Sequence, residues 1–346
     1  MKILVTGGAG FIGSNFIRHM LLECKDVEIV NFDKLTYSGN LENLADLAEN
    51  SRYQFVRGDI TDAASVAEVM AQGLDAIVNF AAETHVDRSI ENAAPFLHSN
   101  VMGTLTVLEA VRKFRIKLLV QISTDEVYGS AGANDSFTEG QILDPRSPYS
   151  ASKAAADHLV NAYAHTYGVA AITLRCTNNY GPYQFPEKLI PLMIANALEG
   201  KPLPVYGDGM QERDWLYVED YCRAIACVLK DGKPGEVYNV SSGTPTANLV
   251  VIKTILKMLG KPESLIQFVT DRPGHDRRYS LDSSKLRREL GWKPEVIFEE
   301  GIRKTVDWYR KNQVWLQRAR SGEYRNYYER HYTRREETFT KAGTSS

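Results

Sequence analysis

The stretch that decides the fold is VTGGAGFIGSNF, residues 5–16, which follows a short apolar run at the N-terminus. Its three glycines are spaced as GxxGxxG: Gly7, Gly10 and Gly13. Apolar residues then recur at helical spacing between Phe16 and Leu21. A strand, a glycine turn and a helix in this order predict the first unit of a parallel α/β sheet. Glycine permits positive φ angles in the turn and lets a phosphate group approach the backbone at the helix N-terminus.

The same alternation of strand and helix continues through the first half of the chain. Continuous apolar runs predict six strands, at residues 2–7, 27–33, 53–59, 75–83, 117–124 and 169–176. Amphipathic segments between these runs predict helices that cover both faces of the sheet. The expected fold class is therefore α/β, with a doubly wound parallel Rossmann sheet.

The composition changes after about residue 178, where Asn, Gly, Pro and Tyr become frequent and the apolar runs shorten. This change predicts a smaller mixed α/β lobe that binds substrate. We assign residues 1–178 to the first domain, with returning segments from about 214–245. Residues 179–315 belong mainly to the lobe, and residues 316–346 form a polar C-terminal tail.

Charge and cysteine content exclude several classes of protein. The chain has 346 residues and a formal net charge of -2, so we expect neither nucleic acid nor membrane as a partner. No apolar stretch approaches the roughly 18 residues of a spanning helix. The four cysteines form no CxxC pair and no Cys/His cluster with metal-ligand spacing, so we expect no metal site. Reduced thiols favour a cytoplasmic location.

A carboxylate predicts the kind of nucleotide that the glycine turn binds. Asp33 ends the second predicted strand, 20 residues after Gly13. A carboxylate in this place accepts hydrogen bonds from both hydroxyls of an adenosine ribose and repels a 2′-phosphate. The sequence therefore predicts NAD rather than NADP as cofactor. Asp59 and Ile60 end the third strand and are expected beside the adenine.

Two groups of polar residues predict proton transfer near this cofactor. Asp125 and Glu126 follow the predicted strand at 117–124. Repulsion between neighbouring carboxylates raises one of their pKa values, which places an acid next to a base. Tyr149 and Lys153 lie four residues apart on one face of a predicted helix. A nearby ammonium group lowers the pKa of a tyrosine, so that it can accept a hydroxyl proton.

Eight motifs together resemble the extended short-chain dehydrogenases and, within them, the dTDP-glucose 4,6-dehydratases. They lie between residue 1 and about residue 312: TGGAGFIG, DKLTYSGN, FAAETHVDRSI, STDEVYG, YSASK, NNYGPYQFPEKLIP, RDWLYVED and DRPGHDRRY. Several of them are shared with sugar-nucleotide epimerases. Two positions depart from the family's usual pattern, namely Thr84, where serine is usual, and Cys176 before the pair of asparagines.

The resemblance implies an NAD-dependent lyase that converts dTDP-glucose to dTDP-4-keto-6-deoxyglucose. Tyr149, supported by Lys153, would take the proton of the sugar 4-hydroxyl while hydride leaves carbon 4. Thr124 would hydrogen-bond the 4-oxygen. Glu126 would remove the proton of carbon 5, Asp125 would protonate the departing 6-hydroxyl, and hydride would return to carbon 6. These five residues are the implied catalytic set.

The resemblance also assigns binding residues to the two ligands. It implies that the following residues contact the cofactor: Gly7, Gly10, Phe11, Ile12, Gly13, Asp33, Lys34, Leu35, Thr36, Asp59, Ile60, Phe80, Ala81, Ala82, Thr84, Ser99, Tyr149, Lys153 and Asn179. It implies that the following contact the substrate: Thr84, Thr124, Asn178, Lys188, Leu189, Pro204, Tyr206, Arg213, Asn248, Arg272 and His275. Arginine suits the diphosphate because its guanidinium group binds phosphate through two hydrogen bonds.

Other functions stay open at this point. A UDP-sugar 4-epimerase or another nucleotide-sugar 4,6-dehydratase would use the same NAD site, and a protein without activity could bind NAD alone. Epimerisation at carbon 4 needs no acid and base for elimination, so Asp125 and Glu126 favour a dehydratase. Residues 96–114 and 152–168 resemble the two dimer helices of the family and imply a homodimer. Ala154–Ala156, Leu159, Val160 and Tyr163 are the expected contacts.

Overall fold

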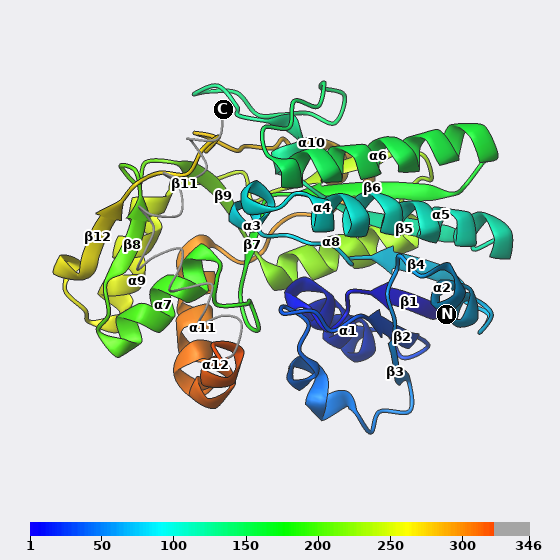
Figure 1. The fold of residues 1–346 in the computed structure, drawn as a ribbon, viewed down its shortest axis with the longest axis horizontal. Helices are drawn as coiled ribbons and strands as arrows, with labels where there is room; N and C mark the ends of the chain where they lie inside the picture. The colour runs from blue at the N-terminus through cyan, green and yellow to red at the C-terminus, as the bar shows by residue number, and fades with distance from the viewer. Residues whose placement is uncertain (322–346) are drawn as a thin grey trace.

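The computed structural model describes residues 1–321, which form a layered α/β core beside a smaller lobe (Figure 1). The core is built on a seven-stranded sheet in the order β10-β6-β5-β4-β1-β2-β3, with every neighbouring pair parallel. The strands are β1 Lys2–Thr6, β2 Glu28–Asp33, β3 Tyr53–Arg57, β4 Ala76–Asn79, β5 Leu118–Thr124, β6 Ala171–Cys176 and β10 Val237–Val240. The chain moves outward from β1 in both directions, which confirms the doubly wound fold.

Successive side chains of β1 show how the sheet buries both faces. Ile3 and Val5 pack in one cluster with Phe16 of the first helix. Leu4 points to the opposite face, where it joins a cluster that contains Val107. Because each strand supplies apolar side chains to both layers, the strands appear in the sequence as continuous apolar runs.

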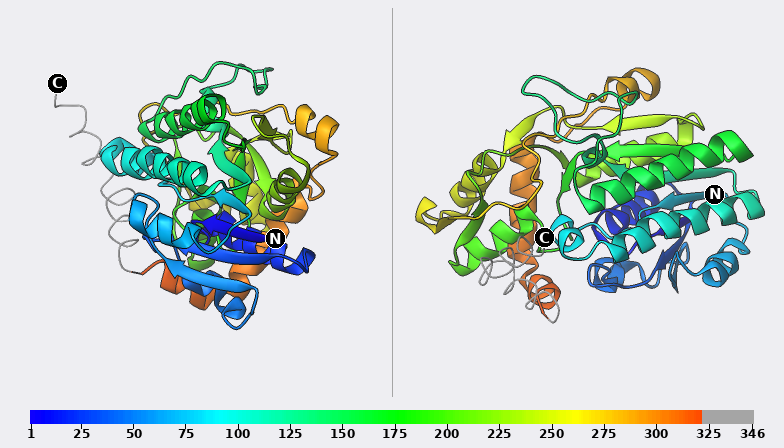
Figure 2. Two further views of the ribbon diagram at one scale, coloured as in Figure 1. Left: turned by 90° about the vertical axis from the view of Figure 1, so that its right-hand side faces the viewer. Right: turned by 45° about the horizontal axis from the view of Figure 1, so that its top comes forward.

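Helices cover the two faces of the sheet. Helices α1 Phe11–Glu23, α8 Val218–Asp231 and α10 Ser284–Leu290 contribute to the cluster on one face. Helices α2 Ala63–Met70, α5 Gly103–Phe114 and α6 Pro148–Tyr167 cover the other. Shorter elements connect them: η1 Leu41–Leu47, α3 Val86–Glu91, α4 Ala94–Phe96, the π-helix η2 Leu97–Met102 and η3 Asp125–Tyr128. Figure 2 shows this layering from two further directions.

The start of α6 is fixed by its own sequence. Ser147 and Ser150 form a capping box, Pro148 occupies the first turn, and Gly168 ends the helix with φ +67°. A capping box satisfies free N–H groups of the first turn, and proline is already suited to the helical φ angle. Tyr149 is therefore placed in the first turn of α6, next to the sheet.

The seventh strand comes from a distant part of the chain. After β6 the chain enters the lobe, and it returns through α8, which packs against α1, and through β10, which pairs with β6. The six strands predicted from apolar runs are all present. Strand β10 has only four residues and lies in the predicted returning segment at 214–245, while the division into domains stays a prediction.

The smaller lobe has two short sheets, in the orders β11-β9-β7 and β12-β8. Its elements are β7 Asn178–Tyr180, α7 Leu189–Glu199, β8 Leu203–Tyr206, β9 Glu212–Tyr217, β11 Pro245–Ala247, α9 Asn248–Leu259, η4 Glu263–Leu265, β12 Ile266–Val269, α11 Phe298–Lys311 and α12 Gln313–Ala319. Helices α7, α9 and α11 pack on one another around a separate apolar cluster. The mixed α/β character expected for this half of the chain is confirmed.

An aromatic cluster closes the lobe near the end of the described chain. The rings of Tyr183, Trp308 and Trp315 lie edge to face, with centroids 4.7–6.1 Å apart, and Tyr309 is fully buried beside them. The predicted tail begins inside this cluster, because Leu316 of α12 is buried; residues 322–346 lie outside the described residues. Within residues 1–321, none of the helices combines the length and the apolar character needed to span a bilayer.

Candidate active site

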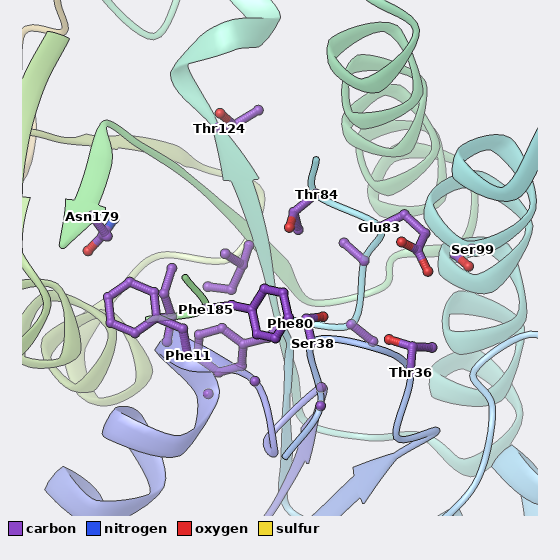
Figure 3. A pocket seen from close by; sticks show the side chains of 18 of the residues that line it. Phe11, Thr36, Ser38, Phe80, Glu83, Thr84, Ser99, Thr124, Asn179 and Phe185 are labelled. Atoms are coloured by element: carbon purple, nitrogen blue, oxygen red, sulfur yellow. The ribbon is translucent and has the colours of Figure 1, made fainter. Parts of the chain in front are cut away.

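A cavity of about 290 Å³ opens at the carboxyl ends of the central strands, between the core and the lobe (Figure 3). The turn after β1 forms its floor, and residues after β2, β4 and β5 line its sides. Phe11, Phe80 and Phe185 point toward one another across it, while Thr124 lies at the end of β5. Ligands of doubly wound folds bind at this edge, where the strand order changes direction.

The glycine turn at the floor of the cavity has no room for side chains. Gly7 has φ +68°, and a Cβ atom on it would lie 2.7 Å from the backbone nitrogen of Ala81. A Cβ on Gly13 would lie 2.5 Å from the carbonyl oxygen of Gly7. Helix α1 therefore packs directly on the turn, and no side chain of residues 1–321 caps its N-terminus. Its free N–H groups and dipole favour an anion at this end.

The carboxylate of Asp33 is held in a fixed orientation at the end of β2. It accepts hydrogen bonds from the backbone N–H groups of Ala9, at 2.9 Å, and Leu35, at 2.8 Å. Leu35 has φ +58° and does not line the cavity, so its contribution is the N–H that orients Asp33. Lys34 forms an ion pair with Asp59 at 2.6 Å on the same side of the cavity.

The neighbouring carboxylates differ in their surroundings. Asp125 is 2% exposed, its Oδ1 accepts a hydrogen bond from Thr124 at 3.1 Å, and its Oδ2 has no hydrogen-bond partner among residues 1–321. Burial, together with the charge of Glu126, raises the pKa of Asp125 well above its usual range. Burial also raises the pKa of Glu126, but Arg272 and Arg213 oppose this shift. Burial therefore disfavours a charge on Asp125, whereas the two arginines stabilise a charge on Glu126.

Tyr149 and Lys153 line the same cavity. Lys153 donates a hydrogen bond to the carbonyl oxygen of Ile122 at 2.6 Å. The expectation that the ammonium lowers the pKa of Tyr149 is wrong for the protein alone. Burial raises the pKa of Tyr149 well above its usual value, and Glu126 adds to the effect. Burial lowers the pKa of Lys153 in turn. Burial therefore disfavours the charged form of both Tyr149 and Lys153.

All five predicted catalytic residues line this cavity, as do all the predicted cofactor residues except Leu35. Four of the predicted substrate residues also line it: Thr84, Thr124, Asn178 and Lys188. Lys188 donates to the carbonyl oxygen of Thr84 at 2.7 Å and so joins the lobe to the segment after β4.

The other predicted substrate residues lie outside the cavity lining. Four of them form one group, which we call the nucleotide-side group: Tyr206, Arg213, Arg272 and His275. The rings of Tyr206 and His275 meet edge to face at 6.2 Å, and burial with Arg272 lowers the pKa of His275 to about 4. The remaining three begin helices or lie in a strand of the lobe: Leu189, Pro204 and Asn248.

Several cavity residues were not predicted from the sequence. They are Phe32, Ser38, Gly39, Gly58, Glu83, Ile122, Ser123, Cys176, Thr177, Gln184, Phe185 and Glu187. Glu187 is 4% exposed and pairs with Arg88 at 3.1 Å, and Arg88 stacks over the ring of Tyr37 at 4.0 Å. The available signal was the charged pair Glu187 and Lys188 inside the otherwise apolar stretch FPEKLIP, because a glutamate is buried only when it is paired.

Comparison with known proteins identifies the family. Residues 4–305 match the model of the family described as GDP-mannose 4,6 dehydratase. The chain is 53% identical over 341 residues to a dTDP-glucose 4,6-dehydratase of Xanthomonas campestris, which covers 93% of this chain and 97% of that protein. It is 50% identical over 362 residues to dTDP-glucose 4,6-dehydratase 1 of Escherichia coli, with coverage of 97% and 100%.

Solved structures give the same relationship. The dTDP-glucose 4,6-dehydratase of Streptomyces venezuelae, with NAD and TYD bound, has a TM-score of 0.90 at 48% identity and covers 92% of this chain and 100% of that chain. A UDP-glucose 4-epimerase of Thermus thermophilus, in complex with NAD, has a TM-score of 0.84 at 33% identity, with coverage of 90% and 100%. The chain therefore belongs to the GDP-mannose 4,6-dehydratase family and, within it, to the dTDP-glucose 4,6-dehydratases.

Proposed function

We propose that the protein is an NAD-dependent lyase that converts dTDP-glucose to dTDP-4-keto-6-deoxyglucose. The observation that carries this proposal is the unequal pair Asp125 and Glu126, in one cavity with Tyr149. Elimination of water from a sugar requires an acid and a base that are present together. Asp125, whose pKa burial raises most, suits the acid, and Glu126, which faces two arginines, suits the base.

The residues of the floor fit NAD. The glycine turn admits a pyrophosphate to the N-terminus of α1, and Asp33 presents a carboxylate for two ribose hydroxyls. The related structures from S. venezuelae and T. thermophilus both contain NAD. When bound, NAD supplies a hydride acceptor that can return the hydride to the same sugar. We propose that the predicted cofactor residues that line the cavity hold it there.

The reacting residues act in sequence on one bound sugar. Tyr149 acts as a phenolate, which the charge of Lys153 stabilises, and it becomes a neutral phenol when it accepts the proton of the 4-hydroxyl. Thr124 donates a hydrogen bond to the 4-oxygen. Glu126 then takes the proton of carbon 5, which the neighbouring ketone has made acidic, and Asp125 gives its proton to the departing 6-hydroxyl. The low exposure of these groups keeps water from competing for the protons.

The nucleotide-side group supplies cations for the diphosphate. Arg213 and Arg272 both act on Glu126 electrostatically, so they lie near the reacting carboxylate. We propose that they bind the diphosphate and that Tyr206 and Pro204 contact the nucleotide base. Lys188, Leu189, Asn178, Asn248 and His275 complete the proposed substrate site.

A UDP-sugar 4-epimerase is the second candidate, supported by the structural likeness to the T. thermophilus enzyme. One end-point assay separates the two. The purified protein is incubated with dTDP-, UDP- and GDP-glucose, and the product is examined for the alkali-stable absorbance of a 4-keto-6-deoxy sugar. We expect this signal with dTDP-glucose. Formation of dTDP- or UDP-galactose without it would support the epimerase and contradict the proposal.

We further propose a homodimer that is formed through η2, α5 and α6. Leu97 and Met102 support this, because both are apolar and about half exposed at the start of this layer. Val160 and Tyr163 pack into the chain's own core, so Leu97 and Met102 offer a partner more exposed apolar surface. Light scattering should give twice the mass of one chain, and Leu97→Glu should reduce the measured mass.

The cytoplasmic location stays a prediction from the cysteines.

A further inference from the structure

We propose that Asp87 is a positioning residue that fixes the nucleotide-side group at a set distance from Tyr149. The inference rests on the proposed function and deepens it, because it concerns how the same site binds a nucleoside diphosphate. Asp87 lies on α3, which Figure 1 shows between the core and the lobe.

Asp87 contacts two residues of the nucleotide-side group at once. Its Oδ2 accepts a hydrogen bond from the hydroxyl of Tyr206 at 2.8 Å, and its Oδ1 accepts one from Nη1 of Arg272 at 3.1 Å. Tyr206 is 119 residues away in sequence and Arg272 is 185 residues away. The carboxylate is 1% exposed. Asp87 thus holds both Tyr206, which we propose contacts the nucleotide base, and Arg272, which we propose binds the diphosphate.

The same helix is anchored to the reacting tyrosine. The backbone N–H of Tyr149 donates to Oγ of Ser89 at 3.1 Å, and Ser89 in turn donates to the carbonyl oxygen of Val86 at 2.6 Å. The side chain of Val86 packs with the ring of Tyr149. In the sequence of α3, Asp87 lies between Val86 and Ser89. Helix α3 therefore links the site of oxidation to the site of nucleotide binding through one short, rigid element.

The charge of Asp87 explains why Arg272 can be buried here. Arg272 interacts electrostatically with both Asp87 and Glu126, and its Nε has no hydrogen-bond partner in the part of the chain that the structure describes. A buried guanidinium without a carboxylate would be strongly destabilised, and it would turn to the nearest anion. Asp87 satisfies Nη1 of Arg272. Arg272 thus keeps its Nε–H as a donor for phosphate.

The test is a double-mutant cycle on the full-length protein loaded with NAD, read out as the affinity for dTDP by titration calorimetry. Asp87→Ala should raise the Kd about tenfold or more, since it removes two hydrogen bonds at a buried charge. Asp87→Asn should raise it less, because the amide oxygen still accepts from Tyr206. Tyr206→Phe should weaken binding several-fold in the wild-type background and have almost no effect beside Asp87→Ala.

The matched control is Glu91→Gln, which alters an exposed carboxylate on the same helix and should leave the Kd within about twofold. In the steady state, Asp87→Asn should raise KM for dTDP-glucose by the same factor as the Kd and leave kcat nearly unchanged. Fully multiplicative effects in the cycle, or an unchanged Kd in Asp87→Ala, would overturn the inference. If Asp87→Ala does not fold, the Kd of Tyr206→Phe for dTDP tests the proposal alone. A Kd equal to that of the wild type then contradicts the proposal.

Failure of the proposed function would look different. Wild-type protein that converts no dTDP-glucose would refute the function, while the Kd ratios remain measurable with dTDP. The same cycle is run with UDP and GDP, and the ligand that the wild type binds decides the inference. Binding of none of the three nucleotides would overturn both.

Discussion

The asymmetry between two neighbouring carboxylates is the central feature at the scale of the residue. Asp125 and Glu126 are adjacent in sequence, yet η3 turns them toward different surroundings. Asp125 has a buried oxygen without a hydrogen-bond partner within the described residues, whereas Arg272, Arg213 and Lys188 oppose the rise in the pKa of Glu126. The surroundings therefore disfavour a charge on Asp125 and stabilise one on Glu126, although the two side chains have the same chemistry.

Isosteric amides should separate the two roles. Glu126→Gln retains the size of the side chain but removes the base, so exchange of the carbon-5 proton with solvent should fall by about 10²–10⁴-fold. Asp125→Asn should still allow oxidation but should slow loss of the 6-hydroxyl, because an amide is a poor acid. Rapid mixing should then show the absorbance of reduced nicotinamide building up. Tyr149→Phe is the control, since it should block oxidation itself. Normal turnover in both carboxylate variants would contradict the assignment.

The pH dependence of kcat should report on Glu126. A base must be ionised, and burial raises the pKa of Glu126, so kcat should fall as the pH drops through that raised value. Arg272 opposes the shift, because its positive charge stabilises the carboxylate. Arg272→Gln should raise the pKa further and move the acid limb of the kcat profile to higher pH. An unchanged limb at saturating substrate would show that another group controls it.

At the scale of the element, the turn between β1 and α1 decides whether the cofactor site exists. Gly7→Ala places a Cβ at positive φ and 2.7 Å from the backbone of Ala81, so both strain and collision act. We expect the free energy of unfolding to fall by about 3 kcal/mol or more, with loss of NAD binding. Gly73→Ala is the matched control, because Gly73 has φ +76° and open space around it. It should lower stability by only about 1–2 kcal/mol, as measured by urea unfolding.

The same scale shows what could be predicted from the sequence. Strands such as β2 and β5 are buried on both faces, so their apolar runs stand out, and Asp33 and Asp125 follow directly from where those strands end. The partners of Glu187 and Asp87 could not be predicted, because each pair joins segments about 100 residues or more apart. The pKa of Tyr149 was misjudged for a related reason. The sequence shows the lysine four residues away, but it does not show how deeply the ring is buried.

At the scale of the whole molecule, the central sheet is completed only by residues that follow the first half of the lobe. Strand β10 pairs with β6, and α8 covers α1. A fragment of residues 1–178 should therefore fail to fold, because it exposes the edge of β6 and the apolar face of α1. Circular dichroism and size-exclusion chromatography of this fragment, compared with the full chain, test this expectation. A monomeric fragment with cooperative unfolding would show that the first domain is independent.

The aromatic cluster of the lobe has an optical consequence. All four tryptophans come after residue 210, and Trp215, Trp308 and Trp315 belong to the lobe, while Trp292 packs beneath α8. Ultraviolet excitation of tryptophan therefore excites mainly residues of the lobe. Emission quenched by reduced nicotinamide through energy transfer would report how near the lobe lies to the cofactor. The tryptophans can thus serve as built-in energy donors for measuring the distance between the lobe and the cofactor, and no dye has to be attached.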